Sequence, residues 1–388
     1  MKIGAVFVKA LREQSRDRLM LALVLVFAPI FVLLYRVWFP SGSTTYGVLL
    51  LDQDAGIQAP DGSLARSGDG VLAALEAVTY ADGSPMLQVR PVAGRAEAES
   101  LLREREAAAL LVLPPGFSQA IVAAGDGRPP AAASIVLSGD LTNPYYAVAA
   151  IVAGSAVDAY VQSATGLTPP IGYVEEPLGA SAARTEFENY VPGLFAFATM
   201  MLMFSTAMVV VREVETGTVR RLQMARVSAA EFLGGITAAQ VLVGLMAVVL
   251  TFLTAYALGF RSEGPMAVVV LVGGITSLSI VGIGLMVASV SRTAMQAFLI
   301  ANFPLALCMF FSSAVFPIPR VPLFTIGGRS IGLYDVLPPT HAVAALNKIL
   351  TFGAGPGEVV FELAALSVLS VTYFALGVWL FKRTHLRR

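Results

Sequence analysis

The sequence predicts an α-helical polytopic membrane protein with six transmembrane helices and an inserted extracytoplasmic α/β (α+β) domain. Hydrophobic residues make up 56% of the 388 positions and charged residues only 13%, and the mean hydropathy is +0.74. Soluble domains carry about twice that share of charge. The charged residues are also gathered into few segments, which leaves long apolar stretches between them.

Six stretches have few or no charges over about 18 residues or nearly so, which is long enough to cross hydrocarbon as a helix. They are Leu19–Tyr35, Tyr190–Val211, Phe232–Phe260, Gly264–Val290, Thr293–Pro319 and Leu363–Phe381. The first is the shortest. Trp38 and Phe39 extend it into the membrane interface while Arg36 reaches toward water, so we expect this span over residues 19–39.

The charges predict the orientation of the chain. Acidic residues predominate between Asp52 and Glu188, and basic residues lie beside the apolar stretches. The basic residues are Lys2, Lys9, Arg12, Arg16, Arg18, Arg212, Arg220, Arg221, Arg226, Lys382, Arg383, Arg387 and Arg388. Because loops rich in Lys and Arg stay in the cytosol, we expect a multi-pass protein of the cell (inner, cytoplasmic) membrane. Both termini are then cytosolic, and residues 40–189 are extracytoplasmic.

Residues 1–18 are predicted to form an amphipathic helix. Its apolar stripe consists of Ile3, Phe7, Ala10, Leu11 and Gln14, and basic residues occupy the other side. A basic amphipathic helix next to a span is typical of a segment that lies in the interfacial plane.

Residues 40–189 read as one water-soluble domain. Predicted strands alternate with predicted helices, which favours layers of helix packed on a mixed sheet. The strands are Tyr46–Leu51, Met86–Val92, Ala109–Leu113 and Ala133–Leu137, and the helices are Val71–Val78, Arg95–Glu106 and Phe117–Ala123. Tyr145–Thr165 begins with a very apolar run, but Asp158 interrupts it, so we expect a core helix that leads back toward the membrane.

Residues 190–388 contain the second to sixth spans and one polar interruption. Residues 318–357 are too polar and too rich in proline to cross the membrane. We expect a pair of short re-entrant or interfacial helices on the outer side, the second starting at Leu337.

The most informative segment is a charged turn between the second and third spans, at about residues 212–226. It contains Glu213, Glu215, Thr216, Gly217, Thr218, Arg220, Arg221 and Leu222. Thr216 or Thr218 could cap the helix that follows, and Val219 and Leu222 offer apolar anchors to a soluble partner. Charges that serve only topology and solubility are the alternative, and for Arg220 and Arg221 the two interpretations carry equal weight.

Few residues could perform chemistry. The chain has one cysteine, Cys308, two histidines, His341 and His385, and no GxxxxGK[ST] phosphate-binding motif. This leaves little material for a zinc site or a Ser-His-Asp triad, so we predict no catalytic residues, no metal site and no cofactor on this chain. Gln296 and Asn302 in the fifth span could line a path, but packing between helices is the favoured role.

Several motifs together resemble the type-2 ABC transporter permeases, in particular the subset with a large external domain between the first two spans. The motifs are Arg16-Asp17-Arg18, Asp52-Gln53-Asp54, Pro114-Pro115-Gly116-Phe117, Tyr190-Val191-Pro192-Gly193, Glu213-Val214-Glu215-Thr216-Gly217-Thr218, Ala314-Val315-Phe316-Pro317 and Leu337-Pro338-Pro339-Thr340. The resemblance covers nearly the whole chain. The segment Arg320–Tyr334 is longer than the usual link in that family.

The resemblance implies the membrane subunit of an exporter that moves a drug, lipid or similar amphiphile out of the cytosol. Its partners would be a pair of ABC ATPase subunits that bind ATP and Mg²⁺, a second permease subunit (identical or a paralogue) and the lipid bilayer. Whether a periplasmic or envelope adaptor is a further partner stays an open question, and no nucleic-acid partner is expected. The turn at Glu213–Leu222 would be the coupling helix, with Arg16, Asp17 and Arg18 at the end of the N-terminal helix. The alternative is a non-transporting receptor or scaffold whose external domain binds a ligand or an envelope protein.

Overall fold

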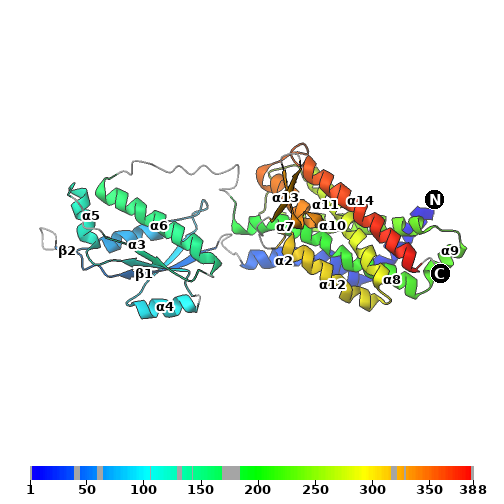
Figure 1. Ribbon diagram of the computed structural model, residues 1–388, viewed down its shortest axis with the longest axis horizontal. Coiled ribbons are helices and arrows are strands. Elements are labelled where there is room, and N and C mark those ends of the chain that lie inside the picture. The colour runs from blue at the N-terminus through cyan, green and yellow to red at the C-terminus, as the bar shows by residue number, and fades with distance from the viewer. Residues whose placement is uncertain are drawn as a thin grey trace. The chain divides into compact units, whose positions relative to one another are not determined.

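The computed structural model describes residues 2–38, 44–58, 64–104, 106–128, 133–141, 143–167, 184–315, 321–326 and 329–385. The chain divides into two compact units (Figure 1). Unit 1 comprises Met1–Pro40 and Leu178–Arg388, and unit 2 comprises Ser41–Pro177. Unit 2 is therefore shorter than the domain expected over residues 40–189, because the chain from Arg184 onward already belongs to unit 1.

Unit 2 is built on a four-stranded sheet with the order β4-β1-β5-β6. The strands are β1 (Tyr46–Asp52), β4 (Leu87–Pro91), β5 (Ala109–Leu113) and β6 (Val136–Ser138). The first three are parallel and β6 is antiparallel, which gives the mixed sheet expected from the sequence. A separate short ribbon pairs β2 (Ile57–Gln58) with β3 (Leu64–Ala65).

Helices cover both faces of this sheet. Helices α3 (Ser67–Glu76), α5 (Phe117–Gly125) and α6 (Pro144–Thr165) share one apolar cluster with the sheet, and α4 (Arg95–Arg103) shares another. Because β5 is covered on both sides, all five of its residues are buried and its sequence is an unbroken apolar run. Glu99 and Arg103, four residues apart on α4, form an ion pair at 3.5 Å.

Seven helices of the described chain are long and apolar enough to cross a membrane, and α6 is one of them. In unit 2, however, α6 buries Ala149, Ala153, Ala156 and Val157 in the cluster that it shares with the sheet. Part of its apolar surface thus belongs to a domain core.

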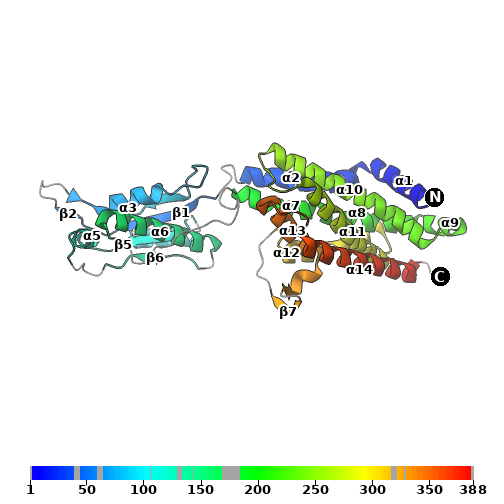
Figure 2. The ribbon, with the colours of Figure 1, turned by 90° about the horizontal axis from the view of Figure 1, so that it is seen from above.

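The other six span-length helices form the bundle of unit 1 (Figure 2), which confirms the predicted polytopic helical fold class. They are α2 (Arg18–Trp38), the pair α7 (Glu186–Met200) and α8 (Leu202–Glu215), α10 (Ala229–Ala257), α11 (Met266–Val290), α12 (Ala294–Phe311) and α14 (Val360–His385). Both termini and the short helix α9 (Thr218–Met224) lie at one end of the bundle, which we call the α9 end (Figure 1).

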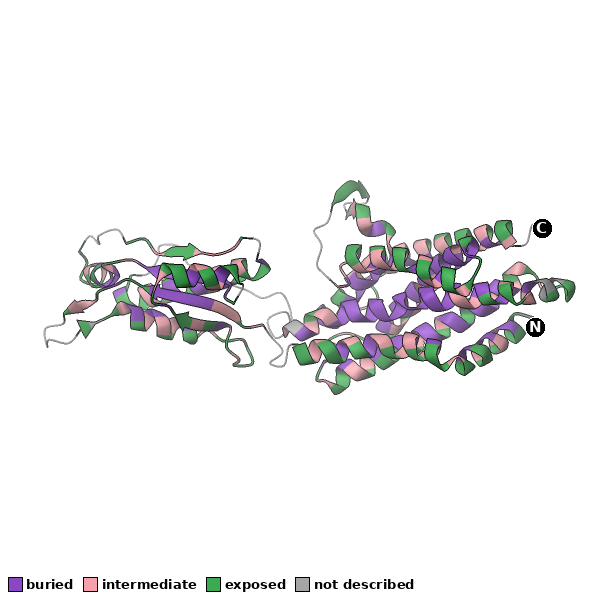
Figure 3. Ribbon diagram, turned by 90° about the horizontal axis from the view of Figure 1, so that it is seen from below, coloured by how far each residue is buried: buried purple, intermediate pink, exposed green. Residues whose placement is uncertain are grey.

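The pair α7–α8 forms the centre of the bundle. Of the 18 consecutive residues that are most apolar in this pair, 89% are buried. In the other five spans the buried share of the corresponding 18 residues runs from 17% to 61%. Figure 3 shows the buried residues gathered along the middle of unit 1. Met201, which separates the two helices, keeps helical dihedral angles (φ −63°, ψ −21°), so the chain crosses the bundle as one rod.

The polar interruption differs from the prediction in its first half. A β-hairpin of β7 (Pro322–Ile326) and β8 (Arg329–Gly332) stands where the first short helix was expected, followed by the 3₁₀ turn η2 (Leu333–Val336). The run Leu323-Phe324-Thr325-Ile326 contains residues that favour strands, and proline spacing alone did not reveal this. The second helix, α13 (Pro338–Phe352), starts where the prolines predicted. We call the end of the bundle that holds the C-terminus of α13 the α13 end.

The N-terminal helix α1 (Lys2–Arg16) packs along α10. Its buried residues are Val6, Ala10 and Gln14, while Ile3, expected on the apolar stripe, is 48% exposed. A Cβ atom on Gly235 of α10 would lie 2.7 Å from the Cβ of Val6 and 2.9 Å from the carbonyl oxygen of Ile3. The glycine therefore permits the close approach of the two helices.

Candidate functional site

The charged turn is formed by the end of α8, a left-handed glycine and α9. Helix α8 ends at Glu215, and Gly217 has φ +68°, a conformation that other residues adopt only at a cost. The Thr216 hydroxyl donates to the Arg212 carbonyl (3.0 Å), which covers the end of α8. The guanidinium of Arg221 donates to the Thr216 carbonyl (3.3 Å) and to the Thr218 hydroxyl (3.1 Å), which fixes the start of α9.

Two ion pairs join this turn to the N-terminal helix. Arg212 donates to a carboxylate oxygen of Asp17 at 2.8 Å, and Lys9 forms a very short contact with Glu213. Lys9 also pairs with Glu13 at 3.2 Å. Asp17 additionally accepts a hydrogen bond from the backbone of Met20 (3.2 Å), so it caps the start of α2.

The electrostatic environment of the two α1-side carboxylates differs. The hydrogen bond from Arg212 holds the pKa of Asp17 below its usual range. Burial, and then the neighbouring Glu213 carboxylate, raise the pKa of the Glu13 carboxyl. The pair at Asp17 is therefore ionised at neutral pH, and the Glu13–Lys9–Glu213 cluster carries two acidic groups around one cation.

A buried polar cluster continues from these ion pairs into the bundle. Gln14, only 4% exposed, donates to the Ser205 hydroxyl of α8 at 3.0 Å. The Gln240 amide of α10 donates to Gln14 at 3.4 Å. The N-terminal helix is thereby joined by side-chain hydrogen bonds to two spans that are distant in sequence.

A groove of about 650 Å³ opens between these elements. Its lining includes Gln14, Asp17, Arg212, Glu213, Thr218 and Arg221. One oxygen of Glu213, the Oε2 atom, is buried without a hydrogen-bond partner among the described residues. Within the described residues, no group of three or more His, Cys, Asp or Glu side chains could hold a metal ion.

The structure brings the two predicted segments together. Arg16 and Asp17 line the same groove as Glu213, Thr216, Thr218 and Arg221, and Arg18 is exposed at the start of α2. Glu215 instead accepts a hydrogen bond from the backbone of Ala294 (3.3 Å) at the start of α12. For Arg220 and Leu222 the structure describes the backbone, which is helical, and their side chains lie outside the described part.

Three side chains with possible roles predicted from the sequence make contacts within their own region of the bundle. Val219, proposed as an anchor for a partner, is 7% exposed and belongs to the core of the bundle. Gln296 accepts a hydrogen bond from the backbone of Arg292 (2.8 Å) in the first turn of α12. Asn302 donates to the carbonyl of Phe298 (2.9 Å) within the same helix.

Sequence reasoning missed Lys9, Glu13, Ser205 and Gln240 as parts of the site. Gln240 carried a signal, because it is a lone amide in a long uncharged span, where polar side chains are expected to bond between helices. Lys9 and Glu13 look like ordinary surface charges of an amphipathic helix, and only the fold places Glu213 beside them.

Comparison with known proteins decides the family. A sequence model described as ABC-2 family transporter protein matches residues 18–379. The chain belongs to the ABC-2 transporter family. This ABC-2 protein is also similar to the linearmycin resistance permease protein LnrN of Bacillus subtilis (strain 168), with 30% identity over 202 residues. That match covers 52% of the chain and 50% of the relative.

Membership of the family agrees with the multi-pass helical architecture and with the resemblance found in the motifs. The matched family is one of ABC transporters, and the relative is a permease protein.

Proposed function

We propose that this ABC-2 protein is the permease subunit of an exporter that moves an amphiphilic substrate, such as a drug or lipid, out of the cytosol. A separate pair of ATPase subunits would bind ATP and Mg²⁺ and drive it, and two permease subunits, identical or paralogous, would assemble in the cell membrane. The α9 end of the bundle is assigned to the cytosol because of its arginines. Unit 2 would then lie outside the cytosol.

One observation carries this proposal. The turn at Gly217 is tied to the N-terminal helix through the Arg212–Asp17 pair and the Lys9–Glu213 pair. A force applied to α9 by a soluble partner would therefore be shared by α1 and by the central rod α7–α8. The carboxylate of Glu215 extends the same connection to α12.

The turn would act as the coupling helix through its local geometry. Gly217 gives the sharp change of direction, and Arg221 holds the turn to α9 by bonding to Thr216 and Thr218. The exposed carboxylate of Glu215 and the guanidinium groups of the turn would meet charged residues of the ATPase.

The test uses Gly217→Val and Glu215→Gln in the complex purified from native membranes. Both variants should insert and fold, but substrate transport should lose its coupling to ATP hydrolysis. Gly83→Val is the matched control, because Gly83 also has a positive φ (+81°) with open space around it and lies in unit 2. Unchanged transport in both variants would refute the coupling role. A receptor or scaffold predicts instead that no ATPase co-purifies with the wild-type chain.

A further inference from the structure

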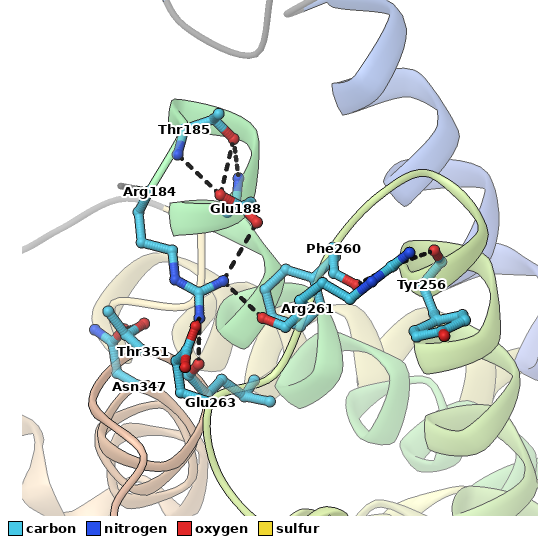
Figure 4. A network of polar contacts seen from close by, with 10 residues as sticks. Arg184, Thr185, Glu188, Tyr256, Phe260, Arg261, Glu263, Asn347 and Thr351 are labelled. Atoms are coloured by element: carbon cyan, nitrogen blue, oxygen red, sulfur yellow. Dashed lines mark hydrogen bonds and ion pairs between the residues drawn. The ribbon is translucent and has the colours of Figure 1, made fainter. Parts of the chain in front are cut away.

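A second polar network lies at the α13 end of the bundle and centres on Arg184 (Figure 4). Arg184 stands directly before α7, where the described chain resumes after unit 2. Its side chain is only 5% exposed. A charge is rarely buried to this degree unless its donors are satisfied, because removing it from water is costly.

The guanidinium of Arg184 reaches three separate elements. It donates to the carbonyl of Arg261 in the α10–α11 loop (2.8 Å) and to the carbonyl of Leu350 in the last turn of α13 (2.7 Å). It also pairs with Glu188 of α7 (3.3 Å) and with Glu263 of the loop (3.5 Å). The same group lies over the ring of Phe260, 5.3 Å from its centroid.

The network also anchors the start of the central rod. The side chains of Thr185 and Glu188 form a reciprocal capping box at the N-terminus of α7. Glu188 is therefore fixed by the cap and by Arg184 together (Figure 4). The loop is held on α13 by a backbone hydrogen bond from Glu263 to the Leu350 carbonyl (3.1 Å).

The two networks lie at opposite ends of the same rod. The described span Phe187–Glu215 has 29 residues, which corresponds to about 43 Å of helix. Its last turn holds Arg212 and Glu213, and its first turn holds Glu188. Since the rod is almost wholly buried and keeps helical dihedral angles at Met201, it forms a continuous connection between the two networks.

We propose that Arg184 is the positioning residue that joins the central α7–α8 span to α13 and the α10–α11 loop, so that movement started at the α9 end reaches α13. This inference rests on the proposed function, because it assumes that a partner drives the α9 end. The planar guanidinium group suits this role because its several N–H donors are fixed in direction. A lysine ammonium at the same place could bond to only part of the two carbonyls and two carboxylates.

The test compares Arg184→Lys and Arg184→Gln with Arg261→Lys in the reconstituted complex with its ATPase. Arg261 is the matched control: it is an arginine of the α10–α11 loop, and among the described residues its side chain bonds to the carbonyls of Tyr256 and Phe260 and stacks on Tyr256 at 4.1 Å. We expect the Arg184 variants to keep ATP hydrolysis within about twofold and to lose transport by about tenfold or more, the size of one charge-assisted hydrogen bond. Arg261→Lys should change neither.

A distance measurement separates positioning from simple stabilisation. Spin labels on Asn189 of α7 and Phe352 of α13, both exposed, should give one narrow distribution in the wild type and a broad one in the Arg184→Lys variant. A purely stabilising role predicts a lower Tm, with hydrolysis and transport falling together and a narrow distribution in the folded fraction; that result would overturn the proposal. If the Arg184 variants do not fold, Glu263→Gln removes one ion pair and should show a smaller loss of transport in the same direction.

A second label pair, on Ser15 and Met224, reports on the α9 end. If this pair responds to nucleotide while the Arg184→Lys variant moves and transports like the wild type, the role of Arg184 is refuted and the proposed function stands. If no nucleotide response occurs at the α9 end of the wild-type complex, the proposed function itself fails.

Discussion

Replacing Gln14 with alanine should release the N-terminal helix from the bundle. The variant leaves the Ser205 hydroxyl and the Gln240 amide, 0% and 1% exposed, without their hydrogen-bond partner on α1. Each buried polar group that loses its partner costs about 1–3 kcal/mol. Ser205 can turn to a carbonyl of its own helix, so we expect about 2–3 kcal/mol in total.

The equilibrium between docked and released α1 should then shift by about 30- to 150-fold, because 1.4 kcal/mol corresponds to a factor of ten. The assay is maleimide labelling of Val6→Cys, a position that is 7% exposed when α1 is docked. The native Cys308 is 1% exposed and adds little background. Labelling should accelerate by the same factor in the Gln14→Ala variant.

Two controls make this prediction specific. Ser15→Ala changes an exposed neighbour whose hydroxyl donates to the Arg12 carbonyl of the same helix, and it should leave the labelling rate unchanged. Gln14→Leu combined with Gln240→Leu removes both amides together, which should restore slow labelling because no buried amide is left unpaired. Equal rates in the wild type and the Gln14→Ala variant would refute the reasoning.

Three further predictions concern single contacts. Asp17→Asn keeps the cap of α2 but loses the charge that pairs with Arg212. Because the pKa of Asp17 is lowered in the folded chain, the wild-type pair stabilises the fold above about pH 3.9, and this stabilisation is lost as the pH falls through the lower pKa of the folded chain. The variant should therefore lack this acid-dependent decrease in Tm, which corresponds to about 0.2–1 kcal/mol of stability. Gly235→Leu should displace α1 at a cost of about 1–3 kcal/mol, seen as faster protease cleavage near the N-terminus. Ser118→Ala should destabilise unit 2 by about 1–3 kcal/mol in thermal unfolding, because the Asp54 carboxylate and the Ser67 amide both lose the hydroxyl.

The sequence predicted the spans and the mixed sheet well because both depend on local pattern. Strand β5 coincides with its predicted bounds, since a short apolar run closed by Pro114-Pro115-Gly116 leaves no ambiguity. The apolar helix α6 was separated from the true spans by one charge, Asp158. The hairpin β7–β8 was missed because its strands are short and paired only with each other, which proline and glycine spacing does not predict.

The site was predicted in part for the same reason. The turn at Gly217 could be predicted from its charges and its glycine. Its contacts with Asp17 could not, because residue spacing does not show which distant segments meet in the fold. Arg184 fell inside the domain expected over residues 40–189, although it lies two residues before the start of α7 at Glu186. Its partners Arg261, Glu263 and Leu350 are far away in sequence, so only the folded chain reveals the network.

In the proposed exporter, an ATPase subunit binds the turn between α8 and α9 from the cytosol. The most direct measurement places a photo-reactive cross-linker at Thr218 in cells, with the same cross-linker at Phe352 as control, and identifies the captured protein by mass spectrometry. We expect capture of an ABC ATPase at Thr218 and none at Phe352. Labelling of the Thr218 position by a membrane-impermeant reagent added outside intact cells, with no ATPase captured, would contradict it.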